Sequence, residues 1–238
     1  MTEYQKTDQW PQILRMRHVN DTILQQNVVN ASSIPSPVNA EQNRIDEWFN
    51  DLQRHTISSI CWLTLQNVPE VKFVVAYKHD ALCLKYYVKE TTHLATYRTS
   101  NEPVFKDSCV EFFIAVNGSG NYYNFEFNSL GTCLASYGKD RHDRLKLAPD
   151  VIAEITSRVK WINYSPATNQ FEWELTVILP VKVFCFDDIQ FQPLQQYQVN
   201  FYKCGDNLPE PHYLAWNPVR STVMDFHQPH FFGALQLV

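Results

Sequence analysis

From residue 57 onward, apolar and polar side chains alternate with a period of two, the pattern of half-buried β-strands. The clearest run is 121–128, where Tyr123, Phe125 and Phe127 point one way and the polar residues between them point the other. Short turn sequences rich in Gly, Pro, Asn and Asp separate such runs. The pattern predicts strands over 57–65, 71–77, 81–88, 109–116, 121–128, 132–137, 151–163, 171–178, 197–204, 212–216 and 233–238.

One segment before these strands has helical spacing instead. Ile45, Trp48, Phe49 and Leu52 follow the i, i+3, i+4, i+7 pattern of a single apolar helix face. Asn39 could cap this helix, since a short side-chain acceptor satisfies the first free backbone donors.

The beginning of the chain shows neither period. Residues 1–36 are polar and irregular, apart from a short strand predicted near Ile13–Val19. We therefore expect an N-terminal arm over residues 1–38 that packs on a single domain over residues 39–238.

Many strands at short intervals, without alternating helices, favour a sandwich over a parallel α/β sheet. The sequence predicts an all-β fold: a two-sheet antiparallel β-sandwich of the jelly-roll or immunoglobulin-like kind, with the arm and one short helix. No internal repeat or domain linker follows residue 57.

The alternation also gives several strands a polar face. Its members are Glu111, Tyr122, Asn124, Glu126, Asn128, Glu172, Glu174, Gln198, Asn200 and Tyr202. If these strands are neighbours, one sheet presents a broad surface of amides, carboxylates and tyrosines. Such groups suit a sugar, whose hydroxyls pair with amides and carboxylates and whose C–H faces pack on aromatic rings. The alternative is an ordinary solvated sheet face.

Composition limits the classes of molecule that the chain is expected to bind. The chain of 238 residues carries a net charge of −5 and no basic block, which argues against nucleic acid and anionic membranes as partners. No run approaches the length of a transmembrane span or of a signal peptide. We expect a cytoplasmic protein as the sequence stands, or a secreted or periplasmic one if an export signal was removed. The six cysteines form no C-x-x-C pair and are expected to be free buried thiols.

Two constellations could carry chemistry. Glu111 and Glu126 on adjacent strands could form the carboxylate pair of a glycosidase, although hydrogen-bonding roles are the simpler interpretation. His212, His227 and His230 could hold zinc or copper, but their spacing matches no standard ligand pattern, so no metal site is assigned.

Short sequence motifs say more about the family of the chain than its periodicity does. The run Val104-Phe105-Lys106-Asp107-Ser108-Cys109-Val110-Glu111-Phe112 resembles the "DSVE-F" strand of carbohydrate-binding module family 9. The run Tyr122–Asn128 and the closing segment Asp225–Leu235 resemble the following strand and the final "W-x-x-P-x-x-F-G-x-L" strand of that family. Asn200–Asp206 and Pro211–Trp216 are similar to family-9-like proteins of Bacteroidetes, and the resemblance covers residues 57–238.

The resemblance implies a sandwich that grips the end of a glucan or xylan chain between two aromatic rings, with bound structural calcium. The first ring falls on Phe105 and the second on Phe226, where the family has Trp. The motif glutamate matches Glu111, whereas the sugar-binding arginine of the family aligns with Glu126. The amide that precedes the second ring in the family has no match, since Val223 and Met224 stand there.

We therefore predict a carbohydrate-binding site that combines Phe105, Glu111, Glu126, Asn128, Trp216 and Phe226, in which Trp216 supplies a larger aromatic platform. Trp216 could equally be a packing residue. Two other functions stay open: a glycoside hydrolase that uses Glu111 and Glu126, and a structural or protein-interaction sandwich that has lost the sugar site.

Overall fold

The computed structural model describes residues 26–34 and 45–238. The strand predicted near Ile13–Val19 and the Asn39 cap lie outside these residues. The strands are β1 (Val28–Ser33), β2 (His55–Thr56), β3 (Ser59–Ile60), β4 (Glu70–Lys78), β5 (Ala81–Glu90), β6 (Cys109–Ala115), β7 (Tyr122–Asn128), β8 (Cys133–Gly138), β9 (Arg144–Lys146), β10 (Thr156–Ser165), β11 (Gln170–Pro180), β12 (Gln196–Cys204), β13 (Tyr213–Ala215) and β14 (Gly233–Leu237). The helices are α1 (Ile45–Asp51) and α2 (Pro149–Ile152), with the short 3-10 turns η1 (Val104–Lys106), η2 (Val181–Val183) and η3 (Pro229–Phe231).

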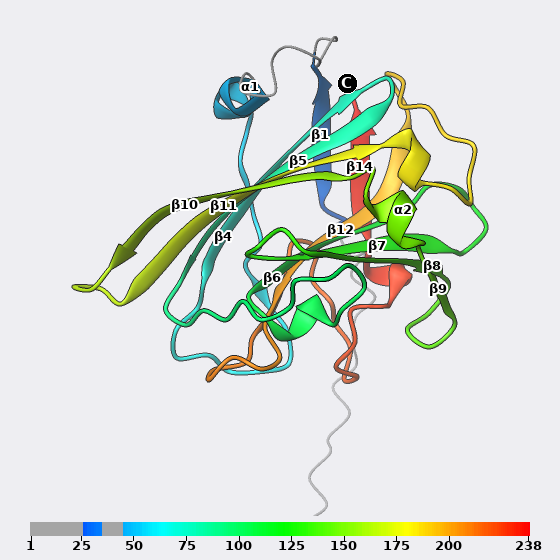
Figure 1. Ribbon diagram of the computed structural model, residues 1–238. Coiled ribbons are helices and arrows are strands. Elements are labelled where there is room, and N and C mark those ends of the chain that lie inside the picture. Colours follow the sequence, from blue (N-terminus) through cyan, green and yellow to red (C-terminus); the bar gives the residue numbers. More distant parts are fainter. Residues whose placement is uncertain (1–25, 35–44) are drawn as a thin grey trace, which may run out of the picture.

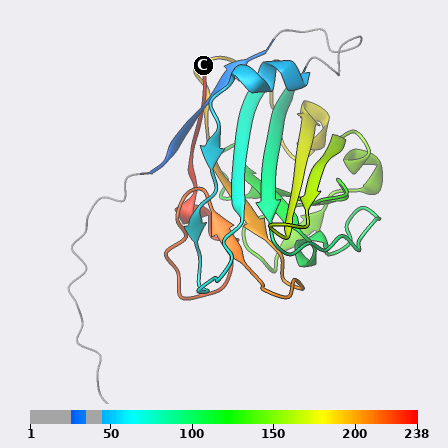
Figure 2. The same ribbon diagram turned by 90° about the vertical axis from the view of Figure 1, so that its left-hand side faces the viewer.

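The strands form two sheets that face each other, as the alternating pattern predicted (Figures 1 and 2). One sheet has the order β14-β12-β6-β7-β8-β9, and the other has the order β10-β11-β5-β4. Neighbours within each run are antiparallel, which suits strands joined by short turns. No helix among the described residues is both long and apolar enough to cross a membrane.

Strand β1 joins the two sheets, and the sequence pattern missed it. Its first residues pair in parallel with β14, and Ser32 and Ser33 then pair in parallel with β4. Val29 and Ala31 are fully buried, while Val28 and Asn30 point outward. Two small buried side chains are too weak a signal to mark a strand in a polar segment, so residues 28–33 were wrongly assigned to the irregular arm.

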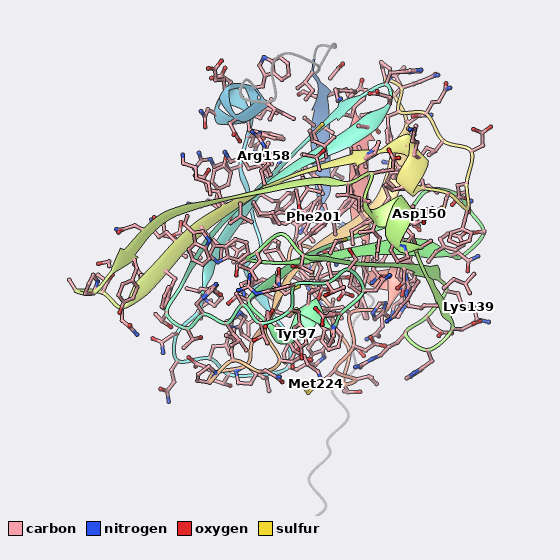
Figure 3. All side chains as sticks on the ribbon, viewed as in Figure 1. Tyr97, Lys139, Asp150, Arg158, Phe201 and Met224 are labelled. Atoms are coloured by element: carbon pink, nitrogen blue, oxygen red, sulfur yellow. The ribbon has the colours of Figure 1, made fainter. Side chains whose placement is uncertain are left out.

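The main core fills the space between the sheets. Phe201 on β12 stacks on Phe73 of β4 with 3.7 Å between ring centroids, and the ring of Phe112 lies 5.0 Å away. Figure 3 shows Phe201 in the middle of the molecule. Alternation predicts core positions for Tyr123, Phe125, Phe127, Phe171, Trp173, Leu175, Val177, Tyr197, Val199 and Phe201, and all but Phe171 lie in this core. Phe171 is half-buried and packs on His93 and Tyr164 instead.

Two predicted strands are wrong in part. Over 57–65 only the two-residue strand β3 forms, with β2 just before this range, because Trp62 adopts a left-handed backbone conformation with φ of 64° and turns the chain. Over 151–163 the first residues belong to helix α2, which begins at Pro149, where the fixed φ of proline suits the first turn of a helix.

Helix α1 is confirmed, and it covers the outer face of the β4–β5–β11 sheet (Figure 2). Its buried residues Ile45 and Phe49 pack against a small apolar cluster of that sheet. On the same face, Lys85 pairs with Asp46 of the helix at 2.8 Å and with Glu174 at 2.9 Å. The polar positions of β11 therefore belong to a different sheet from those of β6, β7 and β12, so the single broad polar surface that we expected does not exist.

A buried ion pair connects the two sheets. The ammonium of Lys203 on β12 lies 2.9 Å from the carboxylate of Glu90 on β5, and both side chains have 1% exposure or less. Lys203 also donates to the Cys204 carbonyl at 3.0 Å and contacts His212 Nε2 at 2.8 Å. Trp173 Nε1 donates to Glu90 at 2.8 Å. The ammonium thus has a carboxylate, a carbonyl and, provided that His212 is neutral, an imidazole acceptor within 3.0 Å.

This arrangement predicts a loss of stability in mild acid. Burial, assisted by the Lys203 charge, lowers the pKa of His212 to about 3. The unfolded chain therefore binds more protons between about pH 3 and 6.5, and stability falls as the pH drops below 6.5. We expect the imidazole to contribute a loss of about 1–2 kcal/mol in the free energy of unfolding between pH 6.5 and 5. Urea unfolding at several pH values would measure it.

The matched variant is His212→Gln, whose amide oxygen can still accept from Lys203 and does not titrate. Its stability should depend less on pH over the same interval. An identical slope in both proteins would contradict the assignment to His212.

Candidate functional site

A pocket of about 440 Å³ lies on the side of the β6–β7–β8–β12 sheet that faces away from the main core. Its floor is the sheet, and its walls come from η1, the β8–β9 hairpin, β13 and loops around residues 62 and 224–227. Figure 3 labels Met224, one of its wall residues, at the lower edge of the molecule. The lining residues are Trp62, Phe105, Glu111, Asn124, Glu126, Leu134, Ser136, Arg141, His142, Arg144, Lys146, Cys204, Asp206, Tyr213, Met224, Asp225, Phe226 and His227.

Strand alternation places the polar floor. Val110 and Phe112 face the core, so Glu111 between them faces the pocket, and Glu126 lies directly opposite it on β7. Glu111, Asn124 and Glu126 are only 3%, 1% and 4% exposed. The polar face predicted for these strands is therefore correct in direction, but loops cover it, and it is not a solvated surface.

A chain of hydrogen bonds orients the floor. Arg144 donates to Asn124 Oδ1 from Nε at 3.0 Å and from Nη2 at 2.6 Å. The other end of the amide, Asn124 Nδ2, donates to Glu126 Oε1 at 2.8 Å. The guanidinium also donates to the carbonyls of Tyr122, Ser136, Gly138 and Asp140. Arg144 thus holds the floor in place, and its N–H donors are used there and not at the pocket opening.

Burial shifts the pKa of both acids of the floor upward. Burial raises the pKa of Glu126 to about 7, against the opposing hydrogen bond from Asn124 and the charge of Arg144. Burial also raises the pKa of Glu111 well above its usual range, with Cys204 and Glu126 adding to the effect. The second oxygen of Glu126, Oε2, is buried and has no hydrogen-bond partner among the described residues. Buried polar atoms are rarely left unpaired, so this oxygen is available to a ligand.

Four aromatic rings form the wall that faces this polar floor, those of Trp62, Phe105, Tyr213 and Phe226. Phe226 stacks on Tyr202 at 4.1 Å and has 8% exposure, so one face of its ring is already used. Trp62 lies 5.2 Å from Phe226 and 5.8 Å from Tyr213, and its indole nitrogen donates to the Ser221 carbonyl at 2.8 Å. Phe105 completes the wall from η1. Trp62 and Phe105 are partly exposed and offer more free ring surface than Phe226.

The structure brings together four of the six predicted site residues, namely Phe105, Glu111, Glu126 and Phe226. It does not bring Asn128 or Trp216 to the pocket. Asn128 is fully buried behind the floor, where its amide donates to Asp107 at 2.9 Å. Trp216 packs in the main core, 6.0 Å from Phe73, because it follows Leu214 on the inward face of β13. The aromatic platform expected from Trp216 is therefore a packing residue.

The three histidines suggested as metal ligands are not one cluster. His212 contacts Lys203 in the buried network, whereas His227 Nδ1 bonds with the Tyr122 hydroxyl at 2.9 Å. His230 is exposed beside Phe231. These three imidazoles therefore do not meet at one point.

Sequence reasoning missed Trp62, Arg144, Asp206 and Tyr213 as pocket residues. Arg144 stands among the charged residues 139–146, a sequence that reads as a solvated turn. Trp62 fell inside a predicted strand, and only its left-handed backbone reveals that the chain turns there toward the pocket. Strained backbone at bulky residues is often found at functional sites.

Comparison with known proteins then identifies the family. A sequence model described as carbohydrate-binding family 9 matches residues 41–237, which is most of the chain. The chain belongs to carbohydrate-binding family 9. The match includes the helix and every described strand except β1. A search of the curated proteins found no match to this family 9 chain.

Solved structures of similar proteins agree with the assignment to family 9. A proposed carbohydrate-binding protein from Bacteroides uniformis ATCC 8492 is 28% identical with a TM-score of 0.82, and covers 90% of this chain and 100% of its own. A family 9 module from Caldicellulosiruptor kristjanssonii, solved with glucose, has 12% identity and a TM-score of 0.60, covering 89% and 96% of the two chains. The structure of such a module with cellotriose has 14% identity, a TM-score of 0.56, and coverages of 89% and 93%. At these identities, the two modules from C. kristjanssonii show a shared fold only.

Among residues 26–34 and 45–238, no group of three closely spaced carboxylates is present to hold the calcium that the sequence resemblance implies. Within the described residues, one group of three His, Cys, Asp or Glu side chains has its ligand atoms close together: Cys109, Glu111 and Cys204. Calcium takes oxygen ligands, usually six to eight, and two of these three atoms are sulfur. We therefore assign no role to calcium.

Proposed function

We propose that the pocket binds a single sugar or the end of an oligosaccharide and does not cleave it. The observation that carries this proposal is the pairing of a partly exposed aromatic wall with a buried polar floor whose oxygen, Glu126 Oε2, lacks a partner. A sugar ring has an apolar C–H face for the wall and hydroxyl donors for that oxygen. The pocket volume of about 440 Å³ lies within the usual range for small-molecule sites.

The ligand class follows from the same chemistry and from the family. A floor of buried carboxyls with raised pKa values suits uncharged sugars, such as the ends of glucan or xylan chains. Because family 9 modules from C. kristjanssonii were solved with glucose and cellotriose, these sugars are the first to test.

A glycoside hydrolase remains the second candidate, because Glu111 and Glu126 do lie opposite each other. Cleavage requires one carboxylate that stays ionised as nucleophile or base beside one protonated acid. Here burial raises the pKa of both carboxyls. This environment favours binding over hydrolysis. Cleavage of aryl glycosides that vanishes in Glu111→Gln would support the hydrolase instead.

The third candidate, a sandwich for protein contacts only, required a filled and flat face. The face is instead hollow, and its walls carry Trp62, Phe105 and Phe226. This shape supports a small ligand.

The proposal predicts that the exposed rings of the wall carry much of the affinity. We expect Trp62→Ala and Phe105→Ala each to weaken sugar binding by about 10- to 100-fold, since buried aromatic anchors typically contribute about 1.4–2.7 kcal/mol or more. Isothermal titration calorimetry with glucose, cellotriose and xylo-oligosaccharides would measure the change.

Trp161→Ala is the matched control, because Trp161 is an exposed tryptophan on β10 outside the pocket. Its affinity should equal that of the unmodified protein. If the unmodified protein binds no glucan, xylan or mannan, or if the control weakens binding as much as Trp62→Ala, the proposal fails.

A further inference from the structure

Three side chains that can bind a metal meet at the floor of the pocket. Cys109 on β6 lies directly opposite Cys204 on β12, and Glu111 follows two residues after Cys109 on the same face. Cys204 Sγ lies 2.9 Å from Glu111 Oε1. All three ligand atoms are within 4.8 Å of one another, and all three residues are buried.

We propose that Cys109, Glu111 and Cys204 bind one divalent ion of zinc type at the floor of the pocket. This inference goes beyond the proposed sugar binding, with which it shares Glu111. Two thiolates and a carboxylate are a ligand set that suits zinc, while magnesium and calcium prefer oxygen. The pocket side is left for a fourth ligand, either a water molecule or a hydroxyl group.

The three ligand atoms need to move only slightly to reach the spacing of a zinc site. Zn–S distances of about 2.3 Å and Zn–O distances of about 2.0–2.2 Å place tetrahedral ligand atoms roughly 3.3–3.8 Å apart. Atoms already within 4.8 Å reach that spacing by side-chain adjustments of about 1 Å or less, with no change in strand register.

The setting offsets part of the charge. Zinc with two thiolates and one carboxylate carries a net charge of −1, which would be costly to bury alone. Arg141, Arg144 and Lys146 line the same pocket and supply positive charge, alongside the acids Glu126, Asp206 and Asp225. Access is available because Glu111 and Cys204 line the pocket, whereas Cys109 does not.

The other cysteines provide the contrast that a test needs. Cys61, Cys83, Cys133 and Cys185 are free, and none belongs to a group of three ligands in the described part of the chain. Cys83 on β5 is as buried as Cys109, but it packs in the apolar cluster under helix α1. Cys83→Ser therefore changes a buried thiol without touching the proposed site.

The experiment is a titration of reduced, metal-free protein with Co²⁺, followed by competition with Zn²⁺. We expect one ion per chain, with the visible bands of tetrahedral Co²⁺ and a thiolate-to-cobalt charge-transfer band. Cys204→Ser and the nearly isosteric Glu111→Gln should bind at least about 100-fold more weakly, since even outer partners of metal ligands contribute 10- to 100-fold. Cys83→Ser should bind like the unmodified protein.

Thermal unfolding of each metal-free variant checks that it is folded. Failure of the folded, reduced protein to bind Co²⁺ and Zn²⁺ stoichiometrically would overturn the proposal. An equal loss of affinity in Cys83→Ser would overturn it as well.

Cys109→Ser separates this inference from sugar binding, because Cys109 does not line the pocket. We expect it to lose the metal, while the metal-free variant keeps its sugar affinity within about twofold, as is usual for sites without shared contacts. Sugar binding without any metal binding would overturn the metal site alone. Metal binding without any sugar binding would overturn the proposed function alone.

Discussion

Replacing Lys203 with methionine should lower the free energy of unfolding by about 3–5 kcal/mol, the usual result of removing one partner from a buried ion pair. Methionine fills a similar volume, so packing changes little. The loss arises because the carboxylate of Glu90 keeps only its hydrogen bond from Trp173 in a site with 1% exposure. His212 Nε2 also loses its donor. Urea or thermal unfolding at pH 7 would measure the difference.

Two further variants separate charge from packing. In the double variant Lys203→Met, Glu90→Gln, the neutral amide removes the unpaired charge and its oxygen still accepts from Trp173, so much of the lost stability should return. Lys89→Met removes the partly exposed partner of Glu172 and should cost at most about 1 kcal/mol. Equal effects of Lys203→Met and Lys89→Met would show that burial does not set the cost.

The fold could be predicted where apolar and polar side chains alternate strongly. It could not be predicted where pairing with strands distant in the chain determines the structure. The aromatic strand Tyr122–Asn128 was placed to within a residue, and its inner rings face the core as expected. Strand β1 was missed because its parallel partners β14 and β4 lie far along the chain and its own residues are small or polar. Pattern alone also could not tell that β11 lies in a different sheet from β7.

The site was predictable to a similar degree. Motif resemblance located Phe105, Glu111, Glu126 and Phe226, which occupy regular strands or short segments next to them. Trp216, suggested as a larger platform beside these residues, lies in the main core, since a one-residue change along a strand exchanges the pocket face for the core face. Trp62 and Arg144 reach the pocket from a turn and a three-residue strand, whose positions depend on tertiary contacts and not on any local period.

One arginine holds the polar floor of the pocket. Arg144 reaches the same floor from β9, and its charge acts on the neighbouring Glu126. Its donors, however, are engaged with Asn124 and with backbone carbonyls. Arg144 is therefore a positioning residue that holds Asn124 and, through it, Glu126.

Replacing the half-buried Arg144 with alanine should weaken sugar binding by about 100-fold, equivalent to about 2.7 kcal/mol, because loss of a charged hydrogen-bonding partner from a desolvated site commonly costs about 2–5 kcal/mol. Without the guanidinium, Asn124 Oδ1 has no fixed donor, and the amide that holds Glu126 Oε1 can rotate. Calorimetry against the best-bound sugar would give the change in affinity, and thermal unfolding would show whether the variant is folded.

Arg144→Lys distinguishes positioning from charge alone. Lysine keeps the positive charge but lacks the planar fork that serves Asn124 and four backbone carbonyls together, so it should restore little of the affinity. Arg98→Ala, at an exposed arginine outside the pocket, should leave binding unchanged. If Arg144→Lys binds as tightly as the unmodified protein, the charge on the floor matters and the orientation of Asn124 and Glu126 does not.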